Sequence, residues 1–428
     1  MQIIGIIISL IIAGIFGFGL MKSEWINRSG FIKWVLIAAL VMKVIGTYFQ
    51  QALYTYYYTD RSTADIYRFF DDGVLLKEVF FFKSKSDFFS IMFNIRTDNT
   101  HFHHSYFEKM NAWIKPFESG FYNDNHIMIK LNALFNFISF DQYEVNGILF
   151  SLLGFTGLLA LITSLIEKSN FRNLALILTC LFPSSLLWLV GGLKETLLIA
   201  ALGGLIFSYF NIAINGYYKP KILVLAFLSL VVLASVKVYF LMTIIPALII
   251  HYIYVRFKLS AFAGIATWIA VIAIGFIGTK TIDFDSIGYI SAKQTDFINH
   301  MDETKAGSAF KMETMEPTLI GLLKYSPVAL SNSLLKPIFP SSFAEMLMLL
   351  ENIVFWAVVL LALLSLKNAS VSKTHWIWLV PFSLALLILI GTTTPVLGAI
   401  MRYRAPIILL LIIAITPYLP SQLTKYFA

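Results

Sequence analysis

Seven ionisable side chains lie within or at the edges of long apolar runs of this sequence. A charged side chain at the centre of a bilayer costs about 3 kcal/mol on insertion scales, so such residues usually face a partner or a water-filled cavity. These positions therefore indicate where chemistry can take place beside a membrane. They are Lys43, Lys194, Glu195, Lys237, Glu351, Arg402 and Arg404.

Four of these residues are cations from three separate turns, and they fall near the same predicted outer ends of the apolar runs. They are Lys194, Lys237, Arg402 and Arg404. Lysine and arginine both bind phosphate, and arginine does so through two parallel hydrogen bonds. We expect the four to converge on one outer cavity that binds the phosphate of a lipid carrier, with Glu195 in a supporting role. Each could instead extend to the headgroups alone, but such anchors should occur at both ends of the runs.

An acidic segment, TDRSTADIYRFFDDG, follows the second apolar run. Asp65, Arg68 and Asp72 have near-helical spacing, so one helix face could present two carboxylates and a guanidinium. A carboxylate placed there could accept the proton of an acceptor hydroxyl as a lipid phosphate departs. The candidate catalytic residues are therefore Asp65, Asp71 and Asp72, with Arg68 supporting them. The alternative is the solvated polar face of an interfacial helix.

Histidines cluster in the run HFHH at His101, His103 and His104, and His126 follows later. This spacing contains no helical i, i+4 histidine pair, and no cysteine completes a metal site. We expect an ordinary loop and predict no metal ligands. No nucleotide-binding loop, GxSxG or HExxH motif is present. Because these motifs are absent, the only cofactor that we retain as a candidate is a divalent cation.

The composition is that of an integral membrane protein. Of the 428 residues 58% are hydrophobic and only 13% are charged, and the mean hydropathy is +0.78, whereas soluble proteins contain about 25% charged residues. The net charge of +8 comes from basic residues scattered over short loops, which argues against a nucleic-acid partner. The single cysteine, Cys180, excludes an intramolecular disulfide.

The apolar runs predict an all-α fold, a polytopic transmembrane helix bundle of about eleven spans that forms one membrane domain over residues 1–428. The first run lacks a basic leading region and a cleavage site, so we interpret it as a retained span. The predicted spans cover residues 3–20, 34–54, 145–166, 173–190, 197–214, 222–236, 239–255, 260–278, 347–366, 376–393 and 405–419.

Charge asymmetry predicts the orientation of these spans. The short loops on one side carry twelve basic and two acidic residues, which places that side in the cytoplasm. Two long outer loops, residues 55–144 and 279–346, then face outward. Each contains an amphipathic stretch that predicts an interfacial helix, and we expect Pro327 and Pro337 to break the second stretch.

The segments ADIYRFFDDG, PSSLLWLVGGLKE and RYRAP resemble the GT-C superfamily of polytopic glycosyltransferases. The resemblance implies transfer of a sugar from a polyprenyl-phosphate carrier to a glycan, lipid or protein acceptor during cell-envelope polysaccharide synthesis. It also implies a bacterial inner-membrane protein whose active site faces the periplasm. The first outer loop of that family carries an essential acid, and Asp65 is the best match.

Two other functions remain open. An O-antigen or exopolysaccharide polymerase or ligase would use lipid-pyrophosphate-linked glycans, and the prominent Arg402 and Arg404 would favour it. A lipid or polysaccharide transporter would need charged residues through the depth of a central path, and only Lys43 meets that condition.

Overall fold

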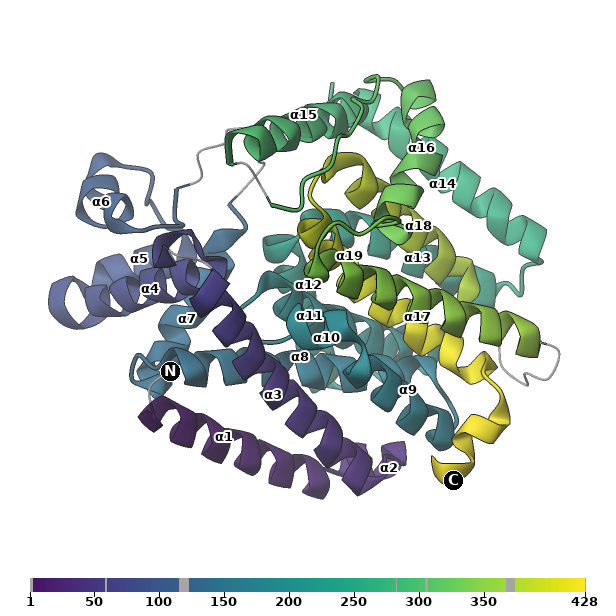
Figure 1. The fold of residues 1–428 in the computed structure, drawn as a ribbon, viewed down its shortest axis with the longest axis horizontal. Coiled ribbons are helices and arrows are strands. Elements are labelled where there is room, and N and C mark those ends of the chain that lie inside the picture. Colours follow the sequence, from purple (N-terminus) through teal and green to yellow (C-terminus); the bar gives the residue numbers. More distant parts are fainter. Residues whose placement is uncertain are drawn as a thin grey trace. The chain divides into compact units, whose positions relative to one another are not determined.

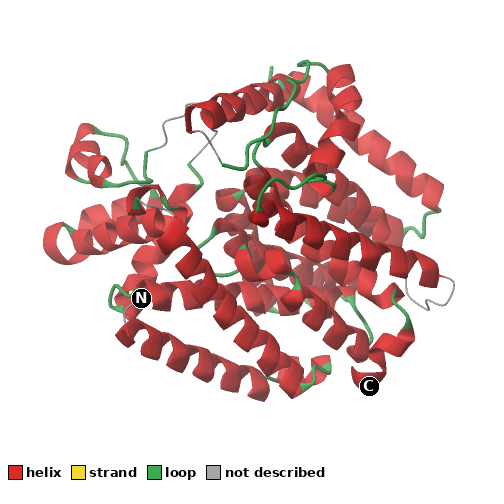
Figure 2. Ribbon diagram, viewed as in Figure 1, coloured by secondary structure: helices red, strands yellow, loops and turns green. Residues whose placement is uncertain are grey.

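A computed structural model describes residues 3–57, 60–114, 123–281, 283–304, 307–366 and 374–427. These residues form helices joined by loops, and their only strand-like pairing is an isolated bridge between Ala309 and Val396 (Figure 2). Among them, eight helices are long and apolar enough to cross a membrane. The all-α, membrane-embedded class is therefore confirmed, and the count of about eleven spans stays a prediction.

The eight candidate spans are distributed over both the N-terminal and the C-terminal half of the described chain. They are α1 (Ile3–Lys22), α3 (Lys33–Tyr57), α8 (Tyr143–Leu165), α11 (Lys194–Tyr209, continued by η4, Phe210–Ile214), α13 (Val238–Arg256), α17 (Phe343–Ser365), α18 (Trp376–Thr393) and α19 (Leu397–Ile415). The other longer helices are α4 (Asp65–Glu78), α5 (Lys85–Phe93), α7 (Asn125–Ser139), α9 (Ser169–Leu181), α12 (Pro220–Val236), α14 (Ala261–Thr281), α15 (Ser286–Thr304) and α16 (Leu319–Leu334).

The run at 173–190 does not form the single span that was predicted. It divides into α9 and the short α10 (Pro183–Leu187), and Phe182 between them has an extended backbone with ψ of 124°. Proline has no amide hydrogen and disfavours helical geometry in the residue before it, so Pro183 ends α9. A left-handed turn at Gly191, with φ of +61°, follows before α11 begins.

Two further boundaries differ from the predictions. The last span starts at Leu397 rather than near residue 405, so Arg402 and Arg404 lie inside α19 and not before it. Pro327 lies within α16 and does not break it, because the helix continues to Leu334.

The chain divides into two compact units, each built from alternating segments. Unit 1 comprises Met1–Leu161, Ser185–Ile206 and Val224–Lys237, and unit 2 comprises Ile162–Ser184, Phe207–Leu223 and Val238–Ala428.

Small residues bring two helices of unit 1 close together. A Cβ atom added to Gly157 of α8 would lie 2.5 Å from the Cα of Ala200 in α11, and one added to Gly203 would lie 2.1 Å from the carbonyl oxygen of Gly157. Such close approach is the usual basis of helix association in lipid, where burial of apolar surface supplies little driving force. In the same unit α4 lies alongside α7 (Figure 1).

The core of unit 2 forms around α18, which packs against α13, α15, α16 and α19. Trp378 and Phe382 of α18 are almost completely buried. Gly391 approaches α16 so closely that an added Cβ would lie 1.9 Å from the carbonyl oxygen of Ala329. Helix α19 also contacts α17, and the two helices are neighbours in Figure 1.

Candidate functional site

The predicted catalytic carboxylates lie on or at the start of α4 in unit 1. Asp65 occupies the first turn, where the positive end of the helix dipole favours an acidic side chain. The apolar face of α4 packs against α7. Gly73 permits the close approach, because an added Cβ would lie 2.7 Å from the Cβ of Asn132.

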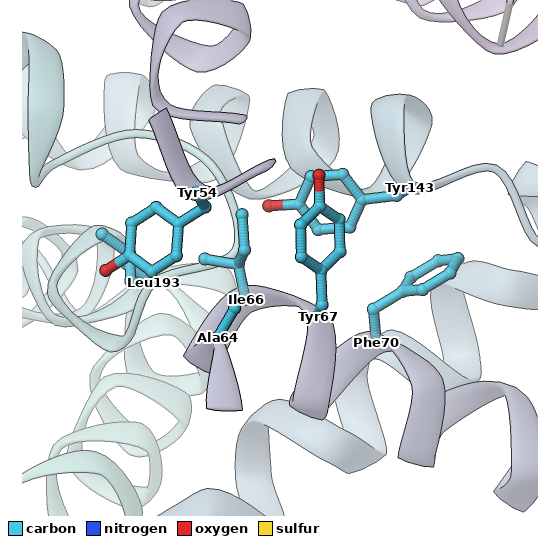
Figure 3. Packing of buried hydrophobic residues seen from close by; sticks show 7 residues of the cluster. All are labelled: Tyr54, Ala64, Ile66, Tyr67, Phe70, Tyr143 and Leu193. Carbon is cyan, nitrogen blue, oxygen red and sulfur yellow. The ribbon is translucent and has the colours of Figure 1, made fainter. Parts of the chain in front are cut away.

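An aromatic cluster fixes the first turn of α4. Figure 3 shows its seven residues, Tyr54, Ala64, Ile66, Tyr67, Phe70, Tyr143 and Leu193. The rings of Tyr67 and Tyr143 are 5.0 Å apart, and Phe70 meets Tyr143 edge-on at 5.5 Å. Such ring pairs contribute about 0.5 to 1.5 kcal/mol each beyond their buried area. The cluster therefore holds Asp65, which lies between two of its members in the sequence, in a defined position.

Asp72 clamps a loop to α4. Its buried carboxylate accepts hydrogen bonds from the backbone amides of Asn111 and Ala112, both at 2.7 Å. Arg68, one turn earlier, donates to the carbonyl oxygen of Asn111 at 2.5 Å. Burial raises the pKa of Asp72 to about 6, although the hydrogen bonds from the amides of Asn111 and Ala112 lower it. The geometry gives Asp72 and Arg68 a structural role.

The other two candidate carboxylates differ in their surroundings. Asp71 receives two hydrogen bonds from Arg61, at 2.7 and 2.8 Å, and the guanidinium of Arg61 also lies 4.0 Å from the ring centre of Tyr67. Asp65 is half-buried at the beginning of the helix, where an acceptor hydroxyl could approach it.

The two predicted phosphate-binding lysines of unit 1 have carboxylate partners. Lys194 lies 2.8 Å from Asp124 and donates to Asn125 at 2.7 Å. Lys237 forms a buried ion pair with Glu195 at 2.8 Å, and Glu195 is completely buried. The Glu195 carboxylate therefore offsets the charge of Lys237, and its predicted support of phosphate binding stays a prediction.

Arg404 of unit 2 lies in a buried network. Only 2% of the residue is exposed. Its guanidinium donates to the carbonyl oxygen of Ser333 at 2.6 Å and to the side-chain oxygen of Asn352, and it lies 3.8 Å from Glu351. Glu351 in turn accepts hydrogen bonds from the amide and hydroxyl of Ser184. The network joins α16, α17 and α19 to Ser184 in the first turn of α10.

Arg402 is half-buried two residues earlier in α19. Residues two apart lie about 200° around a helix, so Arg402 and Arg404 point to different sides of α19. Lys194, Lys237 and Arg404 thus each have a carboxylate neighbour, and the single outer cavity stays a prediction.

One cation that the sequence analysis did not single out lines a pocket of unit 2. The pocket has a volume of about 350 Å³, and its lining includes Phe310, Lys336, Ile338, Phe339, Glu345 and Leu397. A lysine before a proline inside the apolar stretch LLKPIF is the sequence signal that could have identified it.

The histidine-rich loop offers a second set of polar groups. Ligand atoms of His103, His104 and Glu108 all lie within 4.8 Å of one another, and all three residues are exposed. His101 instead pairs with Asp87 at 3.1 Å, and His126 stacks on Trp113 at 3.9 Å. The three-residue cluster could hold a divalent cation, whereas the sequence favoured an ordinary loop.

A scan against protein-family models and searches of curated proteins and of solved structures return no match for this chain.

Proposed function

We propose that this chain is a membrane glycosyltransferase of the GT-C type, which transfers a sugar from a polyprenyl-phosphate carrier to a glycan, lipid or protein acceptor. The observation that carries the proposal is the placement of Asp65. It is a half-buried carboxylate at the start of a helix that an aromatic cluster and the Asp72 clamp hold in place. A general base needs such fixed positioning within reach of the proton that it accepts.

The reaction assigned to this site is a displacement at the anomeric carbon. The bond between that carbon and the carrier phosphate oxygen breaks, and a bond to the acceptor oxygen forms. Asp65 takes the proton of the acceptor hydroxyl, and the polyprenyl phosphate leaves with the bonding electron pair. Cations near the departing phosphate stabilise its charge, and the half-buried Arg402 is the residue proposed for this role.

The proposed location is the bacterial inner membrane, with residues 55–144 and 279–346 in the periplasm. The support is the excess of basic residues in the short loops of the other side, which follows the positive-inside rule.

Cysteine labelling tests this orientation in the Cys180→Ala background. Asp98 and Lys219 are both exposed and lie in segments predicted to face opposite sides. We expect Asp98→Cys to react with an impermeant thiol reagent in intact spheroplasts and Lys219→Cys to react only after lysis. The reverse pattern would show that the topology is inverted.

Transfer by the purified protein in liposomes tests the proposed activity. We expect label to move from at least one of a panel of polyprenyl-phosphate-linked sugars to an added acceptor lipid or glycan, and not from the corresponding nucleotide sugars. A parallel reaction with EDTA tests for a divalent cation, for which His103, His104 and Glu108 are candidate ligands. Transfer only from nucleotide sugars would contradict the proposal. Elongation of a lipid-pyrophosphate-linked glycan would instead support the polymerase or ligase alternative.

A further inference from the structure

The loop between α16 and α17 forms one wall of the 350 Å³ pocket at a predicted membrane boundary. Phe343, just beyond this loop, is the first residue of α17, and the pocket residue Leu397 is the first of α19. Both helices are candidate spans, and α18 returns between them in the chain. Their starts therefore lie on the same side of the bilayer, and the pocket lies at that surface.

Lys336 supplies the positive charge of this pocket. Its Nζ lies 3.8 Å from the ring centre of Phe310, and it forms no ion pair with a carboxylate of the described chain. The acidic pocket residue Glu345 is already used, because its carboxylate accepts hydrogen bonds from the amide and hydroxyl of Ser341 at 2.7 and 2.8 Å. Burial lowers the pKa of Lys336 below its usual range. A partly desolvated ammonium without a counter-ion is stabilised by a bound anion.

The rim of the pocket is apolar and exposed. The exposed fractions are 52% for Ile338 and 90% for Phe339. Large apolar side chains at a membrane boundary contact lipid tails, so a ligand that fits both features combines an anionic head with an apolar tail.

We propose that the Lys336 pocket binds the phosphate group of a membrane lipid, with the ammonium of Lys336 on the phosphate and the side chains of Ile338 and Phe339 against the acyl or prenyl chain. The inference does not rest on the proposed transferase activity, because a structural phospholipid and a polyprenyl phosphate both satisfy it.

Native mass spectrometry of the purified full-length protein in detergent tests the site with four probes. Dioctanoyl phosphatidylglycerol and a short polyprenyl phosphate carry both features, dioctanoylglycerol lacks the phosphate, and inorganic phosphate lacks the tail. Lys336→Gln removes the charge and Lys336→Arg retains it. Lys324→Gln is the matched control, since it removes an exposed charge from α16 in the same unit, away from the pocket lining.

We expect Lys336→Gln to bind phosphatidylglycerol, polyprenyl phosphate or both about 10-fold to 100-fold more weakly, as loss of a charge-assisted contact predicts. Lys336→Arg and Lys324→Gln should bind like the wild type. The lipid that shows the larger loss identifies the source of the phosphate. Phe339→Asn gives an independent test if Lys336→Gln does not fold, because it should weaken lipid binding without changing binding of inorganic phosphate.

Equal lipid binding by the wild type and Lys336→Gln would overturn the proposal. Two other results would also overturn it. Binding of dioctanoylglycerol as tight as that of phosphatidylglycerol would show that the phosphate is not recognised, and equally tight binding of inorganic phosphate would show that the lipid tail is not.

Discussion

Asp65→Asn is expected to reduce turnover by about 10²-fold to 10⁴-fold, the usual effect of removing a positioned general base. The asparagine retains the size of the side chain but cannot accept the acceptor proton. Because the substitution changes neither the aromatic cluster nor the Asp72 clamp, carrier affinity and the folded state should remain close to those of the wild type. The measurement is the turnover number and the carrier affinity of the purified variant in liposomes.

Asp60→Asn is the matched control for this experiment. The substitution also removes one carboxylate charge, five residues before Asp65. The Asp60 side chain is exposed and accepts a hydrogen bond from the amide of Ser62. We expect turnover to remain nearly unchanged. Near-wild-type turnover of Asp65→Asn would show that the base is wrongly assigned, and Asp71 and Asp72 would be tested next. If all three carboxylates are dispensable, the polymerase or transporter hypothesis becomes the better one.

Arg404→Ala is expected to lower the free energy of unfolding by about 3 to 5 kcal/mol, the usual cost of removing one partner of a buried ion pair. Glu351 would remain buried with its charge and without the guanidinium 3.8 Å away. Ser333 and Asn352 would also lose their donor. Equilibrium unfolding in mixed micelles, followed by circular dichroism, measures the change.

The double variant Arg404→Ala/Glu351→Gln separates this structural role from phosphate binding. Neutralising Glu351 removes the unpaired charge, so the double variant should be more stable than Arg404→Ala alone. The half-buried Arg402 gives a contrast, because we expect Arg402→Ala to weaken carrier binding by about 1.5 to 3 kcal/mol with little loss of stability. Wild-type stability of Arg404→Ala together with weaker carrier binding would show that Arg404 acts on the phosphate instead.

Composition and hydropathy were sufficient to predict an all-helical membrane protein, because the free energy of placing a segment in lipid depends mainly on that segment's own side chains. Seven of the predicted spans correspond closely to single candidate spans, from α1 to α18. Pro183 explains one difference, because it ends α9 at Leu181 and so divides the predicted span at 173–190.

The roles of the charged residues were decided only by the tertiary structure. The sequence indicated that Lys194 and Arg404 need partners, but Asn125 lies 69 positions from Lys194, and Asn352 lies 52 positions from Arg404. Hydropathy and periodicity describe near neighbours, so they contain no information about such distant pairs. The same limit explains why Asp72 was grouped with Asp65. Their spacing along one helix is visible in the sequence, whereas the loop at Asn111 that buries Asp72 and binds its carboxylate comes from tertiary packing.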